Sequence, residues 1–219
     1  MKSMYTNKQI WNVSYPIFLS LLAQNVINVT DTAFLGRVGE VELGASAMGG
    51  LYYICAFTIA FGFSTGSQII MARRNGERNY KEVGPVMIQG VLFLLALAAC
   101  MFLLSRLFAR DIMRMLISSD TILAATEEFL DWRVFGFFFS FIGVMFRALF
   151  IGITRTKVLT LNAIVMALTN VLLDYLLIFG HWGLPALGVK GAAIASVIAE
   201  AVSIVFYLIY TACTVDVEK

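Results

Sequence analysis

Six long apolar segments constrain this chain more than any other feature of its sequence. A transmembrane helix needs about 20 mostly apolar residues, because the hydrocarbon core of a bilayer is about 30 Å thick. The segments that reach this length cover residues 10–35, 43–71, 86–105, 125–150, 158–179 and 190–212. They predict an all-α integral membrane protein, built as a bundle of six transmembrane helices.

The low content of charged residues supports a lipid environment. Of the 219 residues, 60% are hydrophobic and only 14% are charged, whereas a soluble domain carries about 25% charged residues. A net charge of +2 indicates no nucleic-acid partner, and no motif indicates an enzyme or a cofactor. Cys55, Cys100 and Cys213 lie far apart in apolar segments, which predicts buried thiols rather than a metal site.

The distribution of Lys and Arg predicts which side of the membrane each loop between the spans faces. An even number of spans puts both termini on one side, and cytoplasmic loops are rich in Lys and Arg. A cytoplasmic N-terminus places ten of these side chains inside and six outside, with the densest cluster, residues 73–81, inside. We therefore predict that both termini are cytoplasmic. Residues 106–120 mix charged and apolar side chains, which predicts a short amphipathic helix on the outer interface.

Three carboxylates lie inside the predicted spans, where an ionised group is costly and usually faces a cavity or a partner. They are Asp31, Asp174 and Glu200. Asp31 lies five residues before Gly36, and Asp174 lies six residues before Gly180. Because both helices run outward and rise about 1.5 Å per residue, both aspartates sit about 8–9 Å below the outer ends of their helices. Two carboxylates at one level predict a shared ion or proton site.

Neutral polar side chains accompany these carboxylates at helical spacing. Asn170 lies one turn before Asp174 and can supply a neutral oxygen to a hard cation. Asp31, Asn170 and Asp174 are therefore the predicted site for H⁺ or Na⁺. A secondary polar lining, on the same helix faces or nearer the midplane, is predicted at Gln24, Asn28, Ser196 and Glu200.

Plainer alternatives stay open for several of these residues. Asn and Gln in membrane helices often only bond across to a neighbouring helix, and Glu200 can simply pair with a nearby cation. Pro16, in the inner part of the first helix, removes one backbone hydrogen bond and permits a hinge. A proline that serves packing alone is equally compatible with that position.

Over essentially its whole length, the sequence resembles the multidrug and toxic compound extrusion (MATE) transporters. The resemblance rests on the order and spacing of short motifs. They are NVTDTAFLG (28–36), GA (44–45), GSQ (66–68), RNGE (74–77), the run 147–152, NVLLDY (170–175), FG (179–180) and GVKGAA (188–193).

The resemblance implies a twelve-helix fold of two six-helix lobes around a central cavity, of which this chain matches the first lobe. It implies an antiporter of the bacterial inner membrane that exports organic, cationic and amphiphilic small molecules in exchange for H⁺ or Na⁺. It places the cation site on Asp31, Asn170 and Asp174 and the helix hinge on Pro16. The implied partners are the lipid bilayer, the organic substrate and a second six-helix lobe.

Two departures from the family pattern concern this site. A tyrosine that often serves it in the fourth helix is Phe129 here, and a threonine of the sixth helix has Ser196 as its nearest counterpart. They leave the choice between Na⁺ and H⁺ open.

Two other functions also stay open. One is a lipid-linked oligosaccharide flippase of the same superfamily, whose cavity is more cationic, and the other is an inactive fragment that lacks its second lobe.

Overall fold

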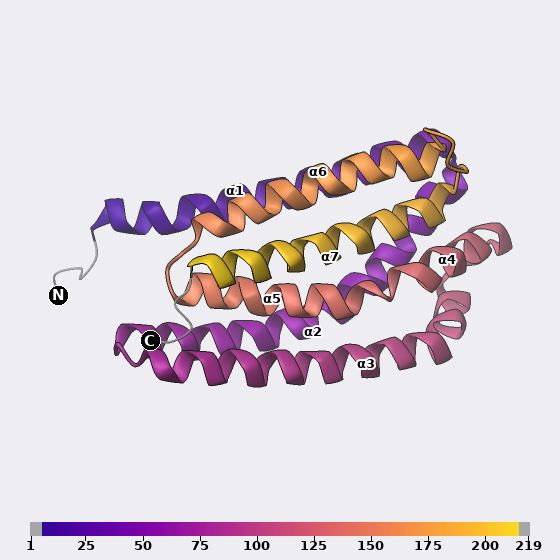
Figure 1. The fold of residues 1–219 in the computed structure, drawn as a ribbon. Helices are drawn as coiled ribbons and strands as arrows, with labels where there is room; N and C mark the ends of the chain where they lie inside the picture. The colour runs from indigo at the N-terminus through magenta and orange to yellow at the C-terminus, as the bar shows by residue number, and fades with distance from the viewer. Residues whose placement is uncertain (1–5, 215–219) are drawn as a thin grey trace.

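The chain folds into a bundle of long helices, which confirms the predicted fold class. A computed structural model describes residues 6–214, and every regular element in that part is helical (Figure 1). The elements are α1 (Asn7–Val38), α2 (Glu40–Gly76), the 3₁₀ turn η1 (Tyr80–Glu82), α3 (Val83–Leu116), α4 (Asp120–Arg133), α5 (Gly136–Gly152), α6 (Lys157–Phe179) and α7 (Gly188–Thr214). Five of them are long and apolar enough to span a membrane, and the bent pair α4–α5 can supply a sixth span.

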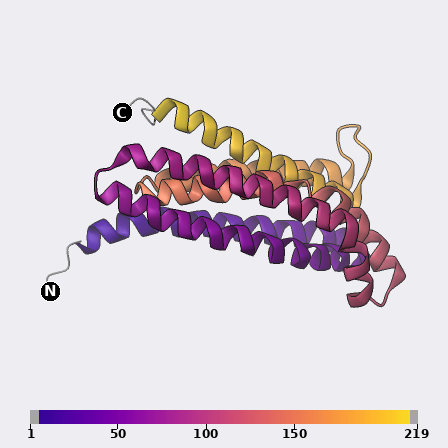
Figure 2. The same ribbon diagram turned by 90° about the horizontal axis from the view of Figure 1, so that it is seen from below.

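The two described ends of the chain lie at the same end of the bundle. α1 begins and α7 ends on one side, together with the α2–α3 and α5–α6 connections (Figures 1 and 2). The α1–α2 and α6–α7 connections lie at the opposite end. This arrangement is the one expected when a chain crosses the bundle six times.

Most helices run a few residues beyond the apolar segments, and polar residues cap the start of α1. At the start of α1, the Gln9 amide nitrogen donates to Thr6 Oγ1 (3.4 Å), and Thr6 N donates back to Gln9 Oε1 (2.9 Å). These reciprocal bonds satisfy donors that a helix start leaves free. The predicted joint over residues 36–42 shrinks to the single extended residue Gly39 between α1 and α2.

The prediction of one continuous helix over residues 125–150 is wrong. The span breaks into α4 and α5, which are inclined by 55° to each other. At the break the amide nitrogens of Phe135 and Phe137 donate to carbonyls three residues earlier, those of Trp132 (3.3 Å) and Val134 (3.2 Å). This tighter spacing replaces the α-helical ladder locally and permits the bend.

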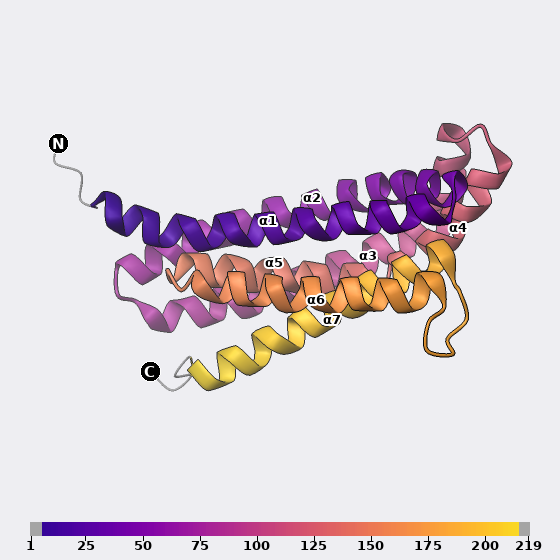
Figure 3. The same ribbon diagram turned by 90° about the horizontal axis from the view of Figure 1, so that it is seen from above.

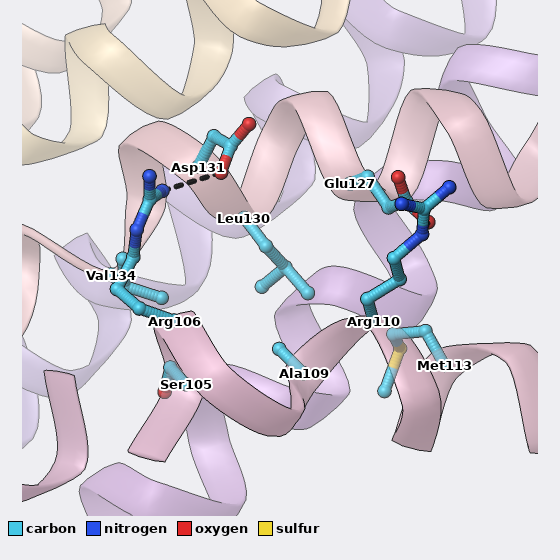
Figure 4. Close-up of a pocket in the computed structure, with 9 residues that line it drawn as sticks. All are labelled: Ser105, Arg106, Ala109, Arg110, Met113, Glu127, Leu130, Asp131 and Val134. Atoms are coloured by element: carbon cyan, nitrogen blue, oxygen red, sulfur yellow. Dashed lines mark hydrogen bonds and ion pairs between the residues drawn. The ribbon is translucent and has the colours of Figure 1, made fainter. Parts of the chain in front are cut away.

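The prediction of a separate amphipathic helix over residues 106–120 is also wrong. This stretch continues α3 as far as Leu116, since no Gly or Pro interrupts it. Figure 1 shows the last turns of α3 bending toward α4. Two ion pairs join α3 and α4 at the shallow cavity between them. Arg106 Nη1 pairs with Asp131 (2.5 Å), and Arg110 Nε pairs with Glu127 (2.9 Å). Figure 4 shows these four side chains. The charges thus serve a helix–helix contact.

The core of the lobe lies between α2, α3 and α5, where Leu94, Phe137, Phe141 and Met145 are fully buried. α1 lies outside this core and packs chiefly along α6 (Figure 3). Only 11% of the most apolar stretch of α1 is buried. Most of its surface is therefore available to lipid or to another protein.

The prediction of buried thiols is wrong as well. Cys55, Cys100 and Cys213 are exposed at the surface of the lobe. A thiol behaves as a small hydrophobic group, so in an apolar span it is as compatible with contact to lipid as with burial in a protein core.

Candidate functional site

Asp31, Asn170 and Asp174 meet where α1 packs against α6. The Asn170 side-chain amide lies 2.9 Å from Asp31 Oδ1 and 3.2 Å from Asp174 Oδ2, so it contacts both carboxyl groups. Asn170 and Asp174 are four residues apart, about one helical turn, so both side chains lie on the face of α6 that α1 covers. The structure therefore brings the three residues of the predicted cation site into contact.

Burial makes this cluster electrostatically unusual. Asp174 and Asn170 are almost fully buried, at 0% and 1% exposed. Asp31, on α1, is partly buried. Within residues 6–214, neither aspartate has a Lys or Arg at salt-bridge distance. Asp174 Oδ1 is buried and has no hydrogen-bond partner, although buried oxygens almost always have one. Among the described residues, no donor or cation therefore compensates this one oxygen of the cluster.

The chemistry of the three side chains fits either a proton or a hard cation. Two carboxylates in contact in a low dielectric repel each other, so a shared proton or a cation must compensate them. With its nitrogen toward the carboxylates, Asn170 donates to both. With its oxygen toward them, it adds a third oxygen ligand of the kind that hard cations prefer.

An apolar layer closes the cluster on the side of the α1–α2 turn. Leu35 and Ile178 each follow an aspartate by one helical turn and are 1% and 2% exposed. Phe129, where the family often has tyrosine, belongs to the same buried layer. Its ring covers Gly49 so closely that a Cβ there would collide with it. This layer excludes water from one side of the site, which strengthens every charge interaction in it.

Within residues 6–214, three other residues of the predicted polar lining make no side-chain hydrogen bond to the aspartates. Gln24 and Asn28 are exposed on α1, and within residues 6–214 neither side chain hydrogen-bonds to the cluster. Ser196 is partly buried on α7. Gln24 and Asn28 still lie along the face of α1 that carries Asp31, so they extend a polar stripe from the cluster across the open surface of the helix.

Glu200 belongs to a second cluster, with Arg133 and Tyr53. Arg133 donates to both Glu200 oxygens, at 2.7 and 3.2 Å, and its guanidinium stacks 3.5 Å from the Tyr53 ring centroid. The Tyr53 hydroxyl lies 3.2 Å from each Glu200 oxygen and 2.7 Å from Ser140 Oγ. The cluster joins α2, α4, α5 and α7 beside the break in the fourth span. Among the alternatives for Glu200, the structure thus favours pairing with a cation.

Arg133 is one of the six Lys and Arg side chains predicted to lie outside, and its pairing with Glu200 was not predicted. A signal was present, because Arg133 lies inside the segment 125–150 that was predicted to span the membrane. An arginine at that depth requires an acidic or π-electron partner.

Pro16 does not break α1, which stays helical on both sides of it. It is buried, and its carbonyl oxygen accepts a hydrogen bond from Thr160 Oγ1 of α6 (2.9 Å). The hinge at Pro16 stays a prediction, now with a defined contact to α6 beside it.

Comparisons with known sequences place this geometry in context. A family model described as MatE matches residues 16–176. A probable multidrug resistance protein NorM from Agrobacterium fabrum is 29% identical over 205 residues, which cover 93% of this chain and 44% of that protein. Another NorM protein, from Synechocystis, is 24% identical over 205 residues, with the same coverage of 93% and 44%. The chain therefore spans less than half the length of these curated relatives.

Solved structures show the same helix arrangement. The crystal structure of a MATE protein in the bent conformation aligns with a TM-score of 0.86 and 19% identity, over 97% of this chain and 46% of that chain. The eukaryotic MATE transporter AtDTX14 aligns with a TM-score of 0.88 and 17% identity, over 96% and 46%. At these identities the likeness shows the fold, and in both cases it covers about half of the longer protein.

Proposed function

This chain belongs to the MatE family, and on that premise we propose that it forms the N-terminal lobe of a multidrug antiporter. In this proposal, H⁺ or Na⁺ binding at Asp31, Asn170 and Asp174 drives the export of organic, cationic and amphiphilic small molecules. The NorM relatives, named as probable multidrug resistance proteins, support this function. It is a transport function rather than an enzymatic one.

The observation that carries the proposal is the buried pair Asp31 and Asp174, with the unpartnered Asp174 Oδ1. A bound cation or proton compensates the pair, and its release leaves two like charges facing each other. Because one carboxylate belongs to α1 and the other to α6, the state of the site changes the force between these helices. α1 is the least enclosed of the long apolar helices and contains Pro16, so it is the element that can respond.

The orientation is part of the same proposal. The basic α2–α3 and α5–α6 connections, which contain Arg78, Lys81 and Arg155, lie at the end of the bundle where α1 begins (Figure 1). By the positive-inside rule, this end faces the cytoplasm. The proposed location is the bacterial inner membrane, with the cation site nearer the outer face and a second six-helix lobe opposite.

Conservative substitutions in the intact transporter test the proposed site. In proteoliposomes with an imposed pH or Na⁺ gradient, Asp31→Asn and Asp174→Asn should each abolish ion-coupled export of a fluorescent organic cation. Both variants should still be expressed and folded, because Asn keeps the shape and most hydrogen bonds of Asp. Asp131→Asn is the matched control, since Asp131 is exposed and pairs with Arg106, outside the site. Coupling near the wild-type level in either site variant would show that the carboxylates are structural.

A further inference from the structure

A second cavity, with a few polar side chains in a mostly apolar lining, lies between α1, α2 and α5, far along α1 from the aspartates. It has a volume of about 310 Å³, at the lower end of the range of about 300–1,000 Å³ for small-molecule pockets. Its polar lining comes from Ser64, Thr65 and Gln68 of α2 and from Arg147 of α5. The rest of the lining is apolar: Ile17 of α1, Phe61 of α2, and Val144, Ala148 and Ile151 of α5. The cavity therefore has room for a headgroup-sized polar ligand and one cationic side chain to hold it.

Arg147 has no anionic partner in the part of the chain that the structure describes. No carboxylate of residues 6–214 lies within salt-bridge distance of it, and its guanidinium carbon lies 5.7 Å from the centroid of the Phe61 ring. The other arginines next to helix–helix contacts do have such partners. Arg133 holds Glu200, Arg106 holds Asp131 and Arg110 holds Glu127.

This contrast identifies the kind of ligand. A guanidinium inside a membrane span is costly unless an anion or a polar network compensates it. The Ser64 and Thr65 hydroxyls already donate to the Phe61 carbonyl oxygen, at 2.8 and 2.9 Å. The Gln68 side chain makes no hydrogen bond within residues 6–214, so its amide is free to donate to a ligand. The cavity thus offers a guanidinium fork and a neutral donor, which is a set suited to an oxyanion.

The position of the cavity favours a phosphate group. It lies toward the end of the bundle with the exposed basic residues Arg78, Lys81, Arg155 and Lys157, which attract anions and an anionic membrane surface. Arginine binds phosphate in a bidentate manner, and basic pockets between transmembrane helices bind anionic lipid headgroups. At this site, Gly152 packs directly on Met71 and Ala72, so α2 and α5 form a fixed base.

We propose that the cavity between α1, α2 and α5 binds a phosphate-bearing anion, with Arg147 as its cationic anchor and Gln68 as a second donor. A lipid headgroup or a soluble phosphate compound presents the same chemistry. The bound anion bridges α2 and α5 beside Ile17, the residue that follows Pro16. This inference does not depend on the proposed cation site, which lies elsewhere on α1.

Native mass spectrometry of the purified 219-residue chain in detergent tests the proposal. The chain should retain phosphatidylglycerol in preference to phosphatidylcholine. Arg147→Gln should weaken that retention about tenfold or more, since a charge-assisted contact is lost. Arg155→Gln is the matched control, because it removes the same charge at the same end of the lobe but outside the cavity. It should leave retention within about twofold of the wild type.

Further arms separate the ligand sources and guard against misfolding. Displacement of the lipid by pyrophosphate would identify a site open to soluble phosphate compounds, whereas retention in its presence would identify a lipid headgroup site. Gln68→Leu keeps the bulk of the side chain, and Arg147→Lys keeps its charge. Each variant should weaken retention of phosphatidylglycerol. These two variants test the proposal if Arg147→Gln does not fold. Equal retention by the wild type and the Arg147 variants, or an equal loss in Arg155→Gln, would overturn the proposal.

Discussion

At the scale of single residues, Gly136 packs closely against the buried ion pair. A Cβ at this position would collide with Arg133, Glu200 and Tyr53 together. Gly136→Ala should therefore lower the free energy of unfolding by about 1–3 kcal/mol, the usual effect of overpacking. Thermal unfolding in detergent measures it. The control is Gly62→Ala, where a Cβ meets nothing within 4 Å, so the variant should be neutral or more stable by about 0.5–1 kcal/mol. Equal behaviour of both variants would contradict the structure.

The ion pair of Arg133 and Glu200 gives a second residue-scale prediction. Their side chains are only 12% and 8% exposed, so Arg133→Met or Glu200→Met alone leaves a buried charge unpaired and should destabilise the fold by about 3–5 kcal/mol. The double variant should recover most of that loss, because neither charge remains. Arg106→Gln, which breaks a largely exposed pair, should cost no more than about 1 kcal/mol. A double-mutant cycle with no coupling would contradict the pairing.

Single residues also show what the sequence could predict. Asp31, Asn170 and Asp174 were predicted to meet because helical spacing and depth can be counted along a chain. The partner of Glu200 was not predicted, since it depends on how α4 and α7 are rotated about their axes. Spacing within one helix carries no information about that rotation. For the same reason the exposure of Cys55, Cys100 and Cys213 was predicted wrongly.

At the scale of elements, α1 gives a prediction about motion. Pro16→Ala restores a backbone N–H in the middle of the helix, where it can bond to the carbonyl of Asn12. The variant should fold normally, show slower hydrogen exchange in the first half of α1, and export more slowly in the intact transporter. The control is Pro85→Ala in the first turn of α3, where an N–H has no helical partner in any case. Unchanged exchange and export in Pro16→Ala would show that Pro16 serves packing alone.

The helix boundaries show a second limit of the sequence. Apolar length predicted where spans lie, yet it could not separate α4 from α5, because Val134 and Phe135 at the break are as apolar as their neighbours. Beside the break, Arg133 pairs with Glu200 of α7, and the missing side chain of Gly136 leaves room for that pair and for Tyr53 of α2. These tertiary contacts cannot be seen in apolar length. In the same way, the charges of α3 near Arg106 and Arg110 were assigned to a membrane interface, although they pair with α4.

At the scale of the whole molecule, the orientation in the membrane can be tested directly. Cys55, Cys100 and Cys213 are first replaced by Ala, which is tolerable because all are exposed. Single cysteines are then placed at Glu40, in the α1–α2 turn, and at Arg78, in the α2–α3 connection. A membrane-impermeant maleimide added to intact cells should label position 40, and it should label position 78 only after the inner membrane is opened. The reverse pattern would overturn the cytoplasmic N-terminus.

The last prediction concerns what one lobe can do. The chain presents an open α1, on which Gln24 and Asn28 are exposed and extend a polar stripe away from Asp31. In transporters built from repeats, the substrate path lies between the repeats, and access alternates when one repeat moves against the other. One lobe supplies only one wall of such a path. The purified monomeric chain in liposomes should therefore not export an organic cation.

Co-reconstitution with a second six-helix lobe of the same family should restore export that depends on the ion gradient. The same pair of lobes with Asp31→Asn should stay inactive, which separates loss of coupling from failure to assemble. Robust efflux by the monomeric 219-residue chain alone would contradict the two-lobe proposal. In that case the open face of α1 would have to be a complete pathway with lipid as its other wall.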